Sequence, residues 1–309
     1  MAVDLSPIDE SLLAEIANLH GMPKGAFNIR KDGQLVERHN SAFIDIETKT
    51  DHPGIDIRIK PGTKGETVYI PVIVTQSGLK DVVYNTFYIG DDCDIKIVAG
   101  CGIHNSSHEA SEHDGIHSFY IGKNSRISYV EKHYGEGEGT GERILNPTTN
   151  VYMEENSTCE MEMVQLRGVP STVRDTNAEL AAGAKLVLTE KLLTHDKQTA
   201  VSNMKVELKG DDSSVQVISR SVAQDDSVQV FNPLVIGEAA CRGHVQRDAI
   251  IMGNAKVKAI PGIEAASEDA LLVHEAAIGK IAGDQIVKLM TLGLTEEEAE
   301  QEILEDFLN

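Results

Sequence analysis

The first group of residues that could do chemistry combines one thiol with four imidazoles. Cys101 and His104 are followed by His108, His113 and His117, with acidic residues between them. Cysteine and histidine side chains suit zinc and iron, whereas carboxylates suit harder ions. The spacing C-x2-H-x3-H-x4-H-x3-H fits no closed zinc motif, so the alternative is a polar surface loop rich in histidine. Cys101 differs from the histidines because it is expected to end a strand.

A second group lies between residues 241 and 248, where a thiol, an imidazole and two guanidiniums occur close together. In a strand, Cys241 and Arg247 would share one face and His244 would lie on the other, because successive side chains point to opposite sides. An arginine beside a thiol favours the thiolate, which raises both nucleophilicity and affinity for metals. The alternative for Cys241 is a small buried apolar side chain, which is common for a lone cysteine.

A third group opens the C-terminal stretch, residues 271–308, where His274 and Glu275 are adjacent. On an extended chain two adjacent side chains point to opposite faces, and on a helix they diverge by about 100°. They therefore cannot form a catalytic dyad with each other. Each of them could still reach another strand or another subunit.

Two short amphipathic helices are expected after this pair. Asp284 can cap the first helix and Gly293 can end it in the left-handed conformation, while Thr295 and Glu298 form a capping box for the second. Helices this short need a surface to lie on, which is either the rest of the chain or a partner. Their apolar faces carry Ile286, Leu289, Met290, Ala299, Ile303, Leu304 and Phe307.

Short alternating strands must position these groups, and they fill the chain from about residue 41 to residue 270. The same turn pattern follows Phe87, Phe119 and Val151, a spacing of 32 residues. A unit of short strands and a tight turn, stacked many times, buries its inward side chains against the neighbouring units. The recurring turn favours a β-helix or β-solenoid over a β-sandwich, whose strands also alternate. A separate helix is expected before the strands, capped by Ser6 with Pro7 at its first position.

The overall composition excludes several classes of function. A net charge of −21 argues against binding nucleic acid or an anionic membrane through a basic face. The sequence shows no signal peptide and no apolar run of membrane-spanning length. The four cysteines are widely spaced and form no C-x-x-C pairs, which indicates reduced thiols and a cytoplasmic protein.

Two enzyme motifs are missing from the sequence. It holds no G-x-x-x-x-G-K-[ST] phosphate loop and no G-x-S-x-G nucleophile turn, so no nucleotide is expected to bind this chain. A β-helix polysaccharide lyase or hydrolase is the remaining enzyme alternative, with carboxylates as acid and base. The 4% content of aromatic residues leaves few rings for stacking on sugars, which counts against it.

Residues 241–265 and 274–308 together resemble the SufB/SufD family of iron–sulfur cluster assembly scaffolds. The resemblance covers roughly residues 41–308, and the chain is similar to a compact SufB-like form. It implies a right-handed parallel β-helix flanked by helical regions. It also implies a SufC-like ABC ATPase docked on the C-terminal helices, and a dimer of scaffold subunits.

The resemblance assigns roles to individual residues. The His-Glu motif of the family matches His274 and Glu275, which become candidate ligands of the cluster at a subunit interface. The reactive cysteine of SufB directly precedes the Asp of a C-D-x-h-h-M segment, in which h is apolar. In this chain Arg247 precedes Asp248 at that point, and a guanidinium cannot ligate iron.

Three explanations account for this substitution. Cys241 could take over the role of the thiol, together with Cys101; the chain could be SufD-like and supply His274 to a site whose thiol comes from a paralogue; or it could keep only an assembly role. We favour the first, because four cysteines and many histidines are present. The candidate ligands of a cluster or metal are therefore Cys241, Cys101, Glu275, His274, His104 and His244.

We expect an N-terminal helical region (1–40), a β-helix core (41–265) and a C-terminal helical region that docks an ATPase (266–309). The predicted function is a scaffold subunit without catalytic turnover, which builds and transfers a transient iron–sulfur cluster. Its predicted partners are a SufC-like ATPase, a second copy or a SufB/SufD paralogue, a sulfur donor and acceptor proteins. The predicted docking residues are Ile286, Leu289, Met290, Ile303, Leu304 and Phe307. The alternatives are a SufD-like structural partner and, more remotely, a polysaccharide-active enzyme.

Overall fold

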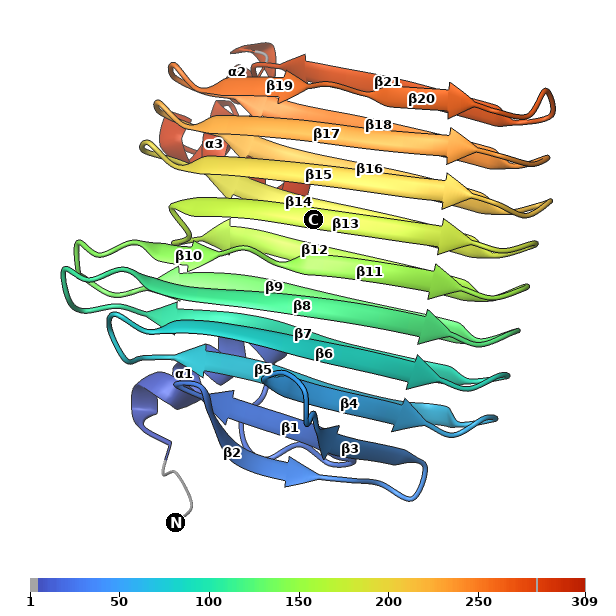
Figure 1. Cartoon of the computed structure of the whole chain (residues 1–309). Coiled ribbons are helices and arrows are strands. Elements are labelled where there is room, and N and C mark those ends of the chain that lie inside the picture. The colour runs from blue at the N-terminus through green and yellow to red at the C-terminus, as the bar shows by residue number, and fades with distance from the viewer. Residues whose placement is uncertain (1–4, 282, 309) are drawn as a thin grey trace.

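The computed structural model describes residues 5–281 and 283–308 of the 309-residue chain. Two long sheets face each other and are joined by short turns, so that the chain winds into a β-solenoid of about eight turns (Figure 1). The predicted fold class, a mainly β solenoid with an N-terminal helix and C-terminal helices, is therefore confirmed. The sandwich alternative is wrong, since neighbouring strands in each sheet come from successive turns of the coil.

Each turn of the coil contributes to both sheets, by one strand or by two shorter ones, and an antiparallel hairpin begins each sheet at its N-terminal end. Sheet A has ten strands in the order β2 (Gln34–His39), β1 (Ala26–Lys31), β5 (Lys64–Val74), β7 (Asp94–His104), β9 (Arg126–Glu136), β12 (Thr158–Arg167), β14 (Lys185–Thr194), β16 (Ser214–Ala223), β18 (Arg242–Ile251) and β21 (Leu271–Gly279). Sheet B has eleven, in the order β19 (Lys256–Ala259), β17 (Val228–Gly237), β15 (Thr199–Leu208), β13 (Ser171–Leu180), β10 (Arg143–Leu145), β8 (Ser111–Ile121), β6 (Lys80–Ile89), β4 (Gly54–Ile59) and β3 (Ile44–Thr48), with β11 (Thr148–Met153) between β8 and β13 and β20 (Gly262–Ala265) beside β17.

The repeat detected in the sequence appears as stacked turns and stacked core side chains. Asp92 and Asn124 occupy the same place in successive turns and both have a left-handed backbone, with φ of 58° and 56°. Asn and Asp tolerate this conformation better than other non-glycine residues, and the amide of Asn124 donates to Asp92 at 3.2 Å. Inside the coil, the rings of Phe87 and Phe119 stack with their centroids 4.4 Å apart.

The N-terminal helix α1 (Pro7–Ala17) covers the outer face of sheet A near the start of the coil (Figure 1). Ser6 caps it as predicted, since its hydroxyl accepts a hydrogen bond from the backbone of Asp9 at 3.3 Å. Leu12 and Ile16 are fully buried in a cluster that includes Val98 of β7. This burial explains why an isolated helix of three turns is stable here.

The two C-terminal helices, α2 (Gly283–Met290) and α3 (Glu296–Leu308), differ in what they lie on. The predicted capping box of α3 is present: the backbone of Thr295 donates to the Glu298 carboxylate at 2.8 Å, and the Glu298 backbone donates to the Thr295 hydroxyl at 3.2 Å. Leu304 and Leu308 are buried against Val222 of β16. The surface that α3 needs is therefore the solenoid itself, whereas no described residue of α2 is buried.

The strands of the solenoid extend past both predicted region borders. The segment 1–40 contains β1 and β2 as well as α1, and the segment 266–309 contains β21. Both additions join sheet A by backbone pairing. In the described part of the chain, every helix is too short or too polar to cross a membrane.

Candidate functional site

The C-terminal end of the solenoid is open. The last strand of sheet A, β21, pairs with β18 along one side, and the order of the described strands ends there. Its side chains include three exposed apolar groups, Leu271, Val273 and Ile278, which are 64%, 54% and 39% exposed. An exposed apolar edge strand is a template for pairing with another strand.

The predicted His-Glu pair lies on this edge strand, and its members point in opposite directions as expected. His274 pairs in register with Val245, a buried residue of β18, and therefore faces the interior. Its Nε2 atom is buried and has no hydrogen-bond partner among the described residues. Glu275 faces outward, where its carboxylate is 3.0 Å from Nε2 of His244. Of the sequence-predicted residues, Glu275 and His244 thus meet on the outer face of this edge, while His274 lies on its inner face.

The His274 ring is kept neutral. Partial burial lowers the pKa of His274, and the nearby His244 lowers it further, while Glu275 acts in the opposite direction. A neutral imidazole has a free lone pair on one ring nitrogen, and this lone pair is what a metal requires. The unpartnered Nε2 atom therefore fits the role of a ligand at the end of the coil.

Cys241 lies just before β18 and is 2% exposed, on the same inward face as Arg247. Burial raises the pKa of the Cys241 thiol, a hydrogen bond from the Ala239 backbone opposes the rise, and the charge of Asp211 adds to it. The predicted stabilisation of a thiolate by a neighbouring arginine is wrong for this conformation, because the side chain of Arg242 lies on the exposed outer face. The thiol of Cys241 is therefore protonated.

Cys101 occupies a second place, deep in the N-terminal half of the solenoid. It lies on β7 and is 2% exposed. Together with His113, His117 and His133 it lines a small cavity of about 10 Å³, close to the smallest space that holds a water molecule. Burial raises the pKa of the Cys101 thiol well above its usual value, and the charges of Asp81 and Glu131 add to the rise.

The four histidines of the first group lie in two different environments. His104 ends β7, where its Nδ1 is 3.2 Å from Glu136, and His108 is exposed beside Thr140. His113 and His117 instead lie on β8 and face inward, 4% and 6% exposed. The surface-loop alternative is therefore wrong for these last two histidines.

Gly115 creates the space that these two imidazoles share. A Cβ atom at this position would lie 2.9 Å from Nε2 of His117 and 3.6 Å from Nε2 of His113. Both Nε2 atoms therefore face the same small volume, which any larger residue would fill. A residue with a side chain at position 115 would force the His117 ring to move.

A buried polar network that the sequence did not reveal surrounds this cavity. Arg174 on β13 donates to the Glu131 carboxylate at 2.5 Å, and the Tyr129 hydroxyl donates to the same carboxylate at 3.0 Å. The oxygen of the same hydroxyl lies 2.9 Å from Nδ1 of His117. Burial alone would raise the pKa of Glu131, but the Arg174 guanidinium and neighbouring imidazoles hold it well below its usual range. Glu131 is therefore ionised inside the core.

Two imidazoles of this network, those of His117 and His133, are neutral. Burial lowers the pKa of His117 to about 4 and that of His133 to about 3, even though the charge of Glu131 favours protonation of both. The signal that could have found this network is the alternation of β9, in which Tyr129, Glu131 and His133 occupy inward positions. The polar character of these residues concealed it.

A second buried network surrounds Arg247, which is 1% exposed. One guanidinium nitrogen bonds the hydroxyl of Ser219, the other donates to Gln229 at 2.9 Å, and the Glu190 carboxylate is 3.8 Å away. Ser219 donates in turn to Glu190 at 2.6 Å. The arginine that replaces the expected cysteine is therefore built into the core rather than exposed at a surface.

The two candidate thiols do not meet within one chain. β7 and β18 are separated by β9, β12, β14 and β16 in sheet A, which at about 4.8 Å per step places Cys101 and Cys241 about 24 Å apart. His274 lies beside Val245 rather than beside Cys241, and four residues of strand span about 13 Å. The predicted joint site of Cys241 with Cys101 is therefore wrong for a single chain in this conformation.

The described residues contain one compact group of possible metal ligands, formed by His195, Asp196 and Asp225, with ligand atoms within 4.8 Å of one another. These side chains lie on neighbouring turns and are mostly exposed. None of the predicted ligands belongs to this group. The geometry therefore defines a β-solenoid protein that carries His274 and Glu275 on the last strand of one sheet, on opposite faces of that strand.

Comparison with known proteins identifies the family to which this solenoid belongs. Residues 78–307 match the family model described as SUF system FeS cluster assembly, SufBD core domain. The chain therefore belongs to the SufBD family, as its resemblance to SufB and SufD predicted. Membership associates it with iron–sulfur cluster assembly.

Relatives that match most of this chain support this assignment. An iron–sulfur cluster assembly SufBD family protein of Methanocaldococcus jannaschii is 26% identical over 296 residues, covering 94% of this chain and 92% of the relative. One of Pyrococcus horikoshii is 28% identical over 333 residues, covering 100% and 96%. One of Archaeoglobus fulgidus is 26% identical over 277 residues, covering 89% and 73%.

Proposed function

We propose that this chain is a scaffold subunit on which an iron–sulfur cluster is built and then passed on, without catalytic turnover of its own. The observation that carries the proposal is the unpartnered Nε2 of His274 on an open edge strand, with the carboxylate of Glu275 on the opposite face of the same strand. Nitrogen and oxygen ligands bind a cluster less tightly than four thiolates do, which suits a protein that must release its product. The cluster is thus cargo rather than a resident cofactor.

The proposed assembly is a dimer formed through β21, with a second copy or a SufB/SufD paralogue. The exposed apolar side chains of this strand, Leu271 and Val273, and its open backbone edge support this arrangement. Pairing of two such edges would satisfy the backbone groups and bring two copies of His274 to one interface. Light scattering should give a dimer for the wild type and a monomer for Val273→Lys. A wild-type monomer at all concentrations, alone and with a paralogue, would contradict this part.

The proposed ATPase partner is a SufC-like ABC ATPase that docks on α2. Val287, Met290 and Leu292 are 59%, 42% and 74% exposed, whereas Leu304 of α3 is buried against the chain's own core. Leu304 is thus corrected from a docking residue to a residue that anchors α3, while Ile303 and Phe307 are half-buried. Val287→Asp should abolish binding of the ATPase without changing the urea midpoint, and Lys288→Gln on the same helix is the matched control.

The experiment that tests the scaffold is anaerobic reconstitution with ferrous iron and sulfide, followed by visible absorption. We expect the wild type, alone or with its ATPase, to gain cluster absorption, and His274→Ala to lose most of it. His108→Ala, which removes an exposed imidazole of the β7–β8 loop, is the control and should match the wild type. Absence of absorption from the wild type under both conditions would overturn the proposal.

A second candidate function is that of a SufD-like partner, which completes the complex but contributes no thiol. The buried, protonated state of Cys241 and Cys101, together with Arg247 at the expected cysteine position, favours it. Cys241→Ser and Cys101→Ser separate the candidates. Unchanged cluster loading in both variants favours the SufD-like role, and lost loading in either one favours a scaffold that uses its own thiol.

The proposed location is the cytoplasm, where a sulfur donor and acceptor proteins would meet this subunit. All four cysteines are free thiols in the structure, as a reducing compartment requires. Because all four thiols are buried, cell fractionation followed by immunoblotting measures the location better than thiol labelling would. Recovery of the protein only outside the cytosolic fraction would contradict this part of the proposal.

A further inference from the structure

A row of tyrosines crosses the outer face of sheet B, on the side of the coil away from the helices. Tyr88 of β6, Tyr120 of β8 and Tyr152 of β11 occupy the same register position on successive strands. Their rings stack almost in parallel, with centroids 5.5 Å and 4.9 Å apart and interplanar angles of 8° and 12°. Each ring is between 37% and 45% exposed. We refer to these three residues as the tyrosine stack.

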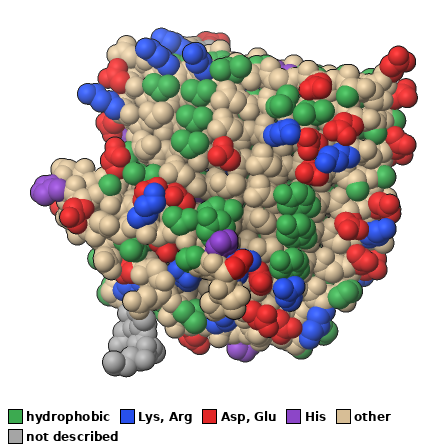
Figure 2. Space-filling model, viewed as in Figure 1, with side chains coloured by type: hydrophobic (Ala, Val, Ile, Leu, Met, Phe, Trp, Pro, Cys, Tyr) green, Lys and Arg blue, Asp and Glu red, His purple; other side chains and the backbone are tan. Residues whose placement is uncertain are grey.

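The two ends of the tyrosine stack differ. At the N-terminal end the guanidinium of Arg58 lies 4.3 Å over the ring of Tyr88. At the other end Tyr152 is followed in register by Glu179 of β13 and then by Glu207 of β15. Figure 2 shows the corresponding column of hydrophobic side chains on this face, with charged side chains above and below it. The chain therefore covers one end of the stack with a cation and places carboxylates at the other.

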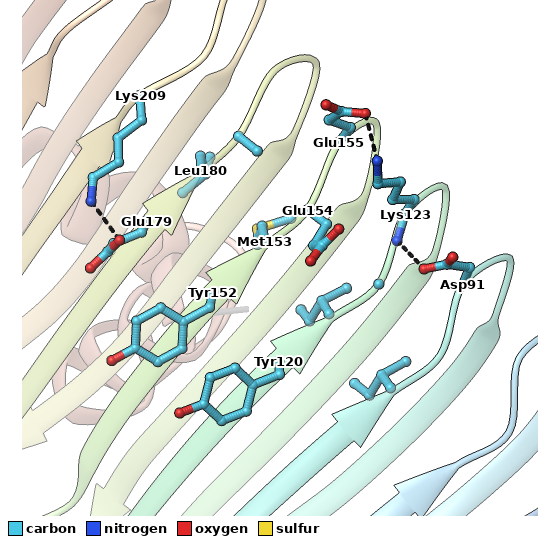
Figure 3. A pocket seen from close by; sticks show the side chains of 14 residues that line it. Asp91, Tyr120, Lys123, Tyr152, Met153, Glu154, Glu155, Glu179, Leu180 and Lys209 are labelled. Carbon is cyan, nitrogen blue, oxygen red and sulfur yellow. Dashed lines mark hydrogen bonds and ion pairs between the residues drawn. The ribbon is translucent and has the colours of Figure 1, made fainter.

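An open groove of about 520 Å³ lies at the acidic end (Figure 3). Its walls include the rings of Tyr120 and Tyr152 and four carboxylates against two ammonium groups, which gives it a net negative charge. Lys123 and Lys209 are already engaged, since each lies close to a carboxylate at 3.1 Å and 2.5 Å. The carboxylates are those of Asp91, Glu154, Glu155 and Glu179.

We propose that this groove binds an arginine side chain presented by an extended segment of a partner protein. The guanidinium would stack on the ring of Tyr152, as Arg58 stacks on Tyr88. Glu154 would accept its hydrogen bonds, and Glu179 would do so by exchanging Lys209, its present partner, for the guanidinium. A cation over an aromatic ring is attracted by the negative face of the ring, and arginine adds planar stacking and a fork of donors that fits a carboxylate. This site is independent of the open end of the solenoid and does not rest on the proposed scaffold function.

The dimensions of the groove favour a peptide over a small cation. From Tyr120 on β8 to Lys209 just past β15 the groove crosses β11 and β13, which is about 14 Å at 4.8 Å per step. An extended chain rises about 3.3 Å per residue, so the groove accommodates about four residues. A stack of tyrosines could instead serve only to stabilise the coil, and a row of rings could also bind a sugar. The experiment below separates these three roles.

The test measures fluorescence anisotropy of dye-labelled hexapeptides on the full chain in 0.15 M salt, which screens non-specific attraction to the acidic surface. The peptides alternate glycine with arginine, lysine or citrulline, the last being an uncharged isostere of arginine. We expect the arginine peptide to bind most tightly, and the lysine and citrulline peptides to bind more weakly. Tyr152→Ser should weaken binding of the arginine peptide by about fivefold or more, and Tyr152→Phe should keep it within about twofold, because phenylalanine retains the ring face.

Matched controls distinguish the site from the acidic surface and from a fold defect. Tyr84→Ser removes another exposed tyrosine of β6, which contacts His52 rather than the tyrosine stack, and should leave peptide binding unchanged. Thermal unfolding of each variant by circular dichroism confirms that the coil is intact. Equal affinity for the three peptides, or no effect of Tyr152→Ser in a folded protein, would overturn the proposal. Displacement of the peptide by maltohexaose would also overturn it and assign the rings to sugar binding.

Discussion

Among the side chains that the structure describes, two arginines are buried inside the solenoid, and their surroundings differ. Arg174 on β13 meets the Glu131 carboxylate directly, at 2.5 Å, in a network that also holds Tyr129. Arg247 on β18 lies 3.8 Å from Glu190 and bonds mainly to the neutral groups of Ser219 and Gln229. The first cation is neutralised by direct contact, while the second is solvated by neutral dipoles. We call these the Arg174 network and the Arg247 network.

The Arg174 network is therefore a structural ion pair, whereas the Arg247 network holds a positive charge near the open end of the solenoid. A direct pair in a low-dielectric core leaves a buried charge when either partner is removed. The Arg247 network leaves the guanidinium with one nitrogen, Nε, that has no partner among the described residues. Burial lowers the pKa of Arg247, and only the more distant Glu190 and Asp248 oppose this. Arg247 thus keeps a partly uncompensated positive charge one strand away from β21, which carries His274.

The largest expected effect comes from removing the cation of the Arg174 network. Arg174→Met would leave the Glu131 carboxylate buried without its cation, and we expect a loss of about 3–5 kcal/mol in the free energy of unfolding. Urea unfolding followed by circular dichroism at pH 7 measures it. The double variant Glu131→Gln/Arg174→Met should recover a large part of this loss, because it removes both charges. A loss below about 1 kcal/mol in the single variant would show that water reaches Glu131.

The second-largest expected effect is a pH dependence of the free energy of unfolding, caused by the imidazoles of the Arg174 network. The folded-state pKa values of His117 and His133 are about 4 and about 3, against about 6.5 for an unfolded chain. As the pH falls, the unfolded state therefore binds protons before the folded state does. The contribution of the two histidines to the free energy of unfolding is complete above pH 6.5 and declines toward pH 4 and below. Linkage gives a loss of about 2 kcal/mol per imidazole at pH 5. The lowered pKa of Glu131 changes nothing in this window, since its contribution is lost only at lower pH.

Urea unfolding at pH 7 and pH 5 measures this dependence against a matched variant. His117→Gln/His133→Gln removes both imidazoles and should flatten the profile between the two pH values, although it lowers stability at pH 7. The Arg247 network contains no imidazole among its bonded partners, so Arg247 variants should keep the wild-type slope. An unchanged slope in the histidine double variant would mean that other histidines account for the dependence.

The sequence predicted those features that depend on alternation and repetition. Residues 241–248 were predicted to alternate, and Cys241, Val245 and Arg247 do face inward. The repeat after Phe87 and Phe119 predicted stacked turns, and the two rings stack in the core.

Features that depend on register between distant strands could not be predicted. Glu131 and Arg174 are 43 residues apart, and nothing local indicates that successive turns bring them together. His113 and His117 carry no apolar signal that would mark them as inward-facing, even though they alternate with the outward-facing Glu112 and Asp114. In a sequence, polar side chains that point into a solenoid cannot be distinguished from polar side chains on its surface.

The smallest expected loss in the free energy of unfolding comes from Arg247→Met. This variant directly tests the difference between the Arg174 network and the Arg247 network. Methionine fills much of the same volume, and the Glu190 carboxylate left behind keeps its 2.6 Å hydrogen bond from Ser219. The loss is therefore the hydrogen bonds of one cation to neutral partners, about 1–3 kcal/mol by urea unfolding at pH 7. Arg247→Lys is the matched control, since it keeps the charge and loses the planar fork. If Arg247→Met costs more than Arg174→Met, then Glu190 rather than Glu131 is the carboxylate that depends on its arginine, and the distances of 3.8 Å and 2.5 Å do not rank the two networks.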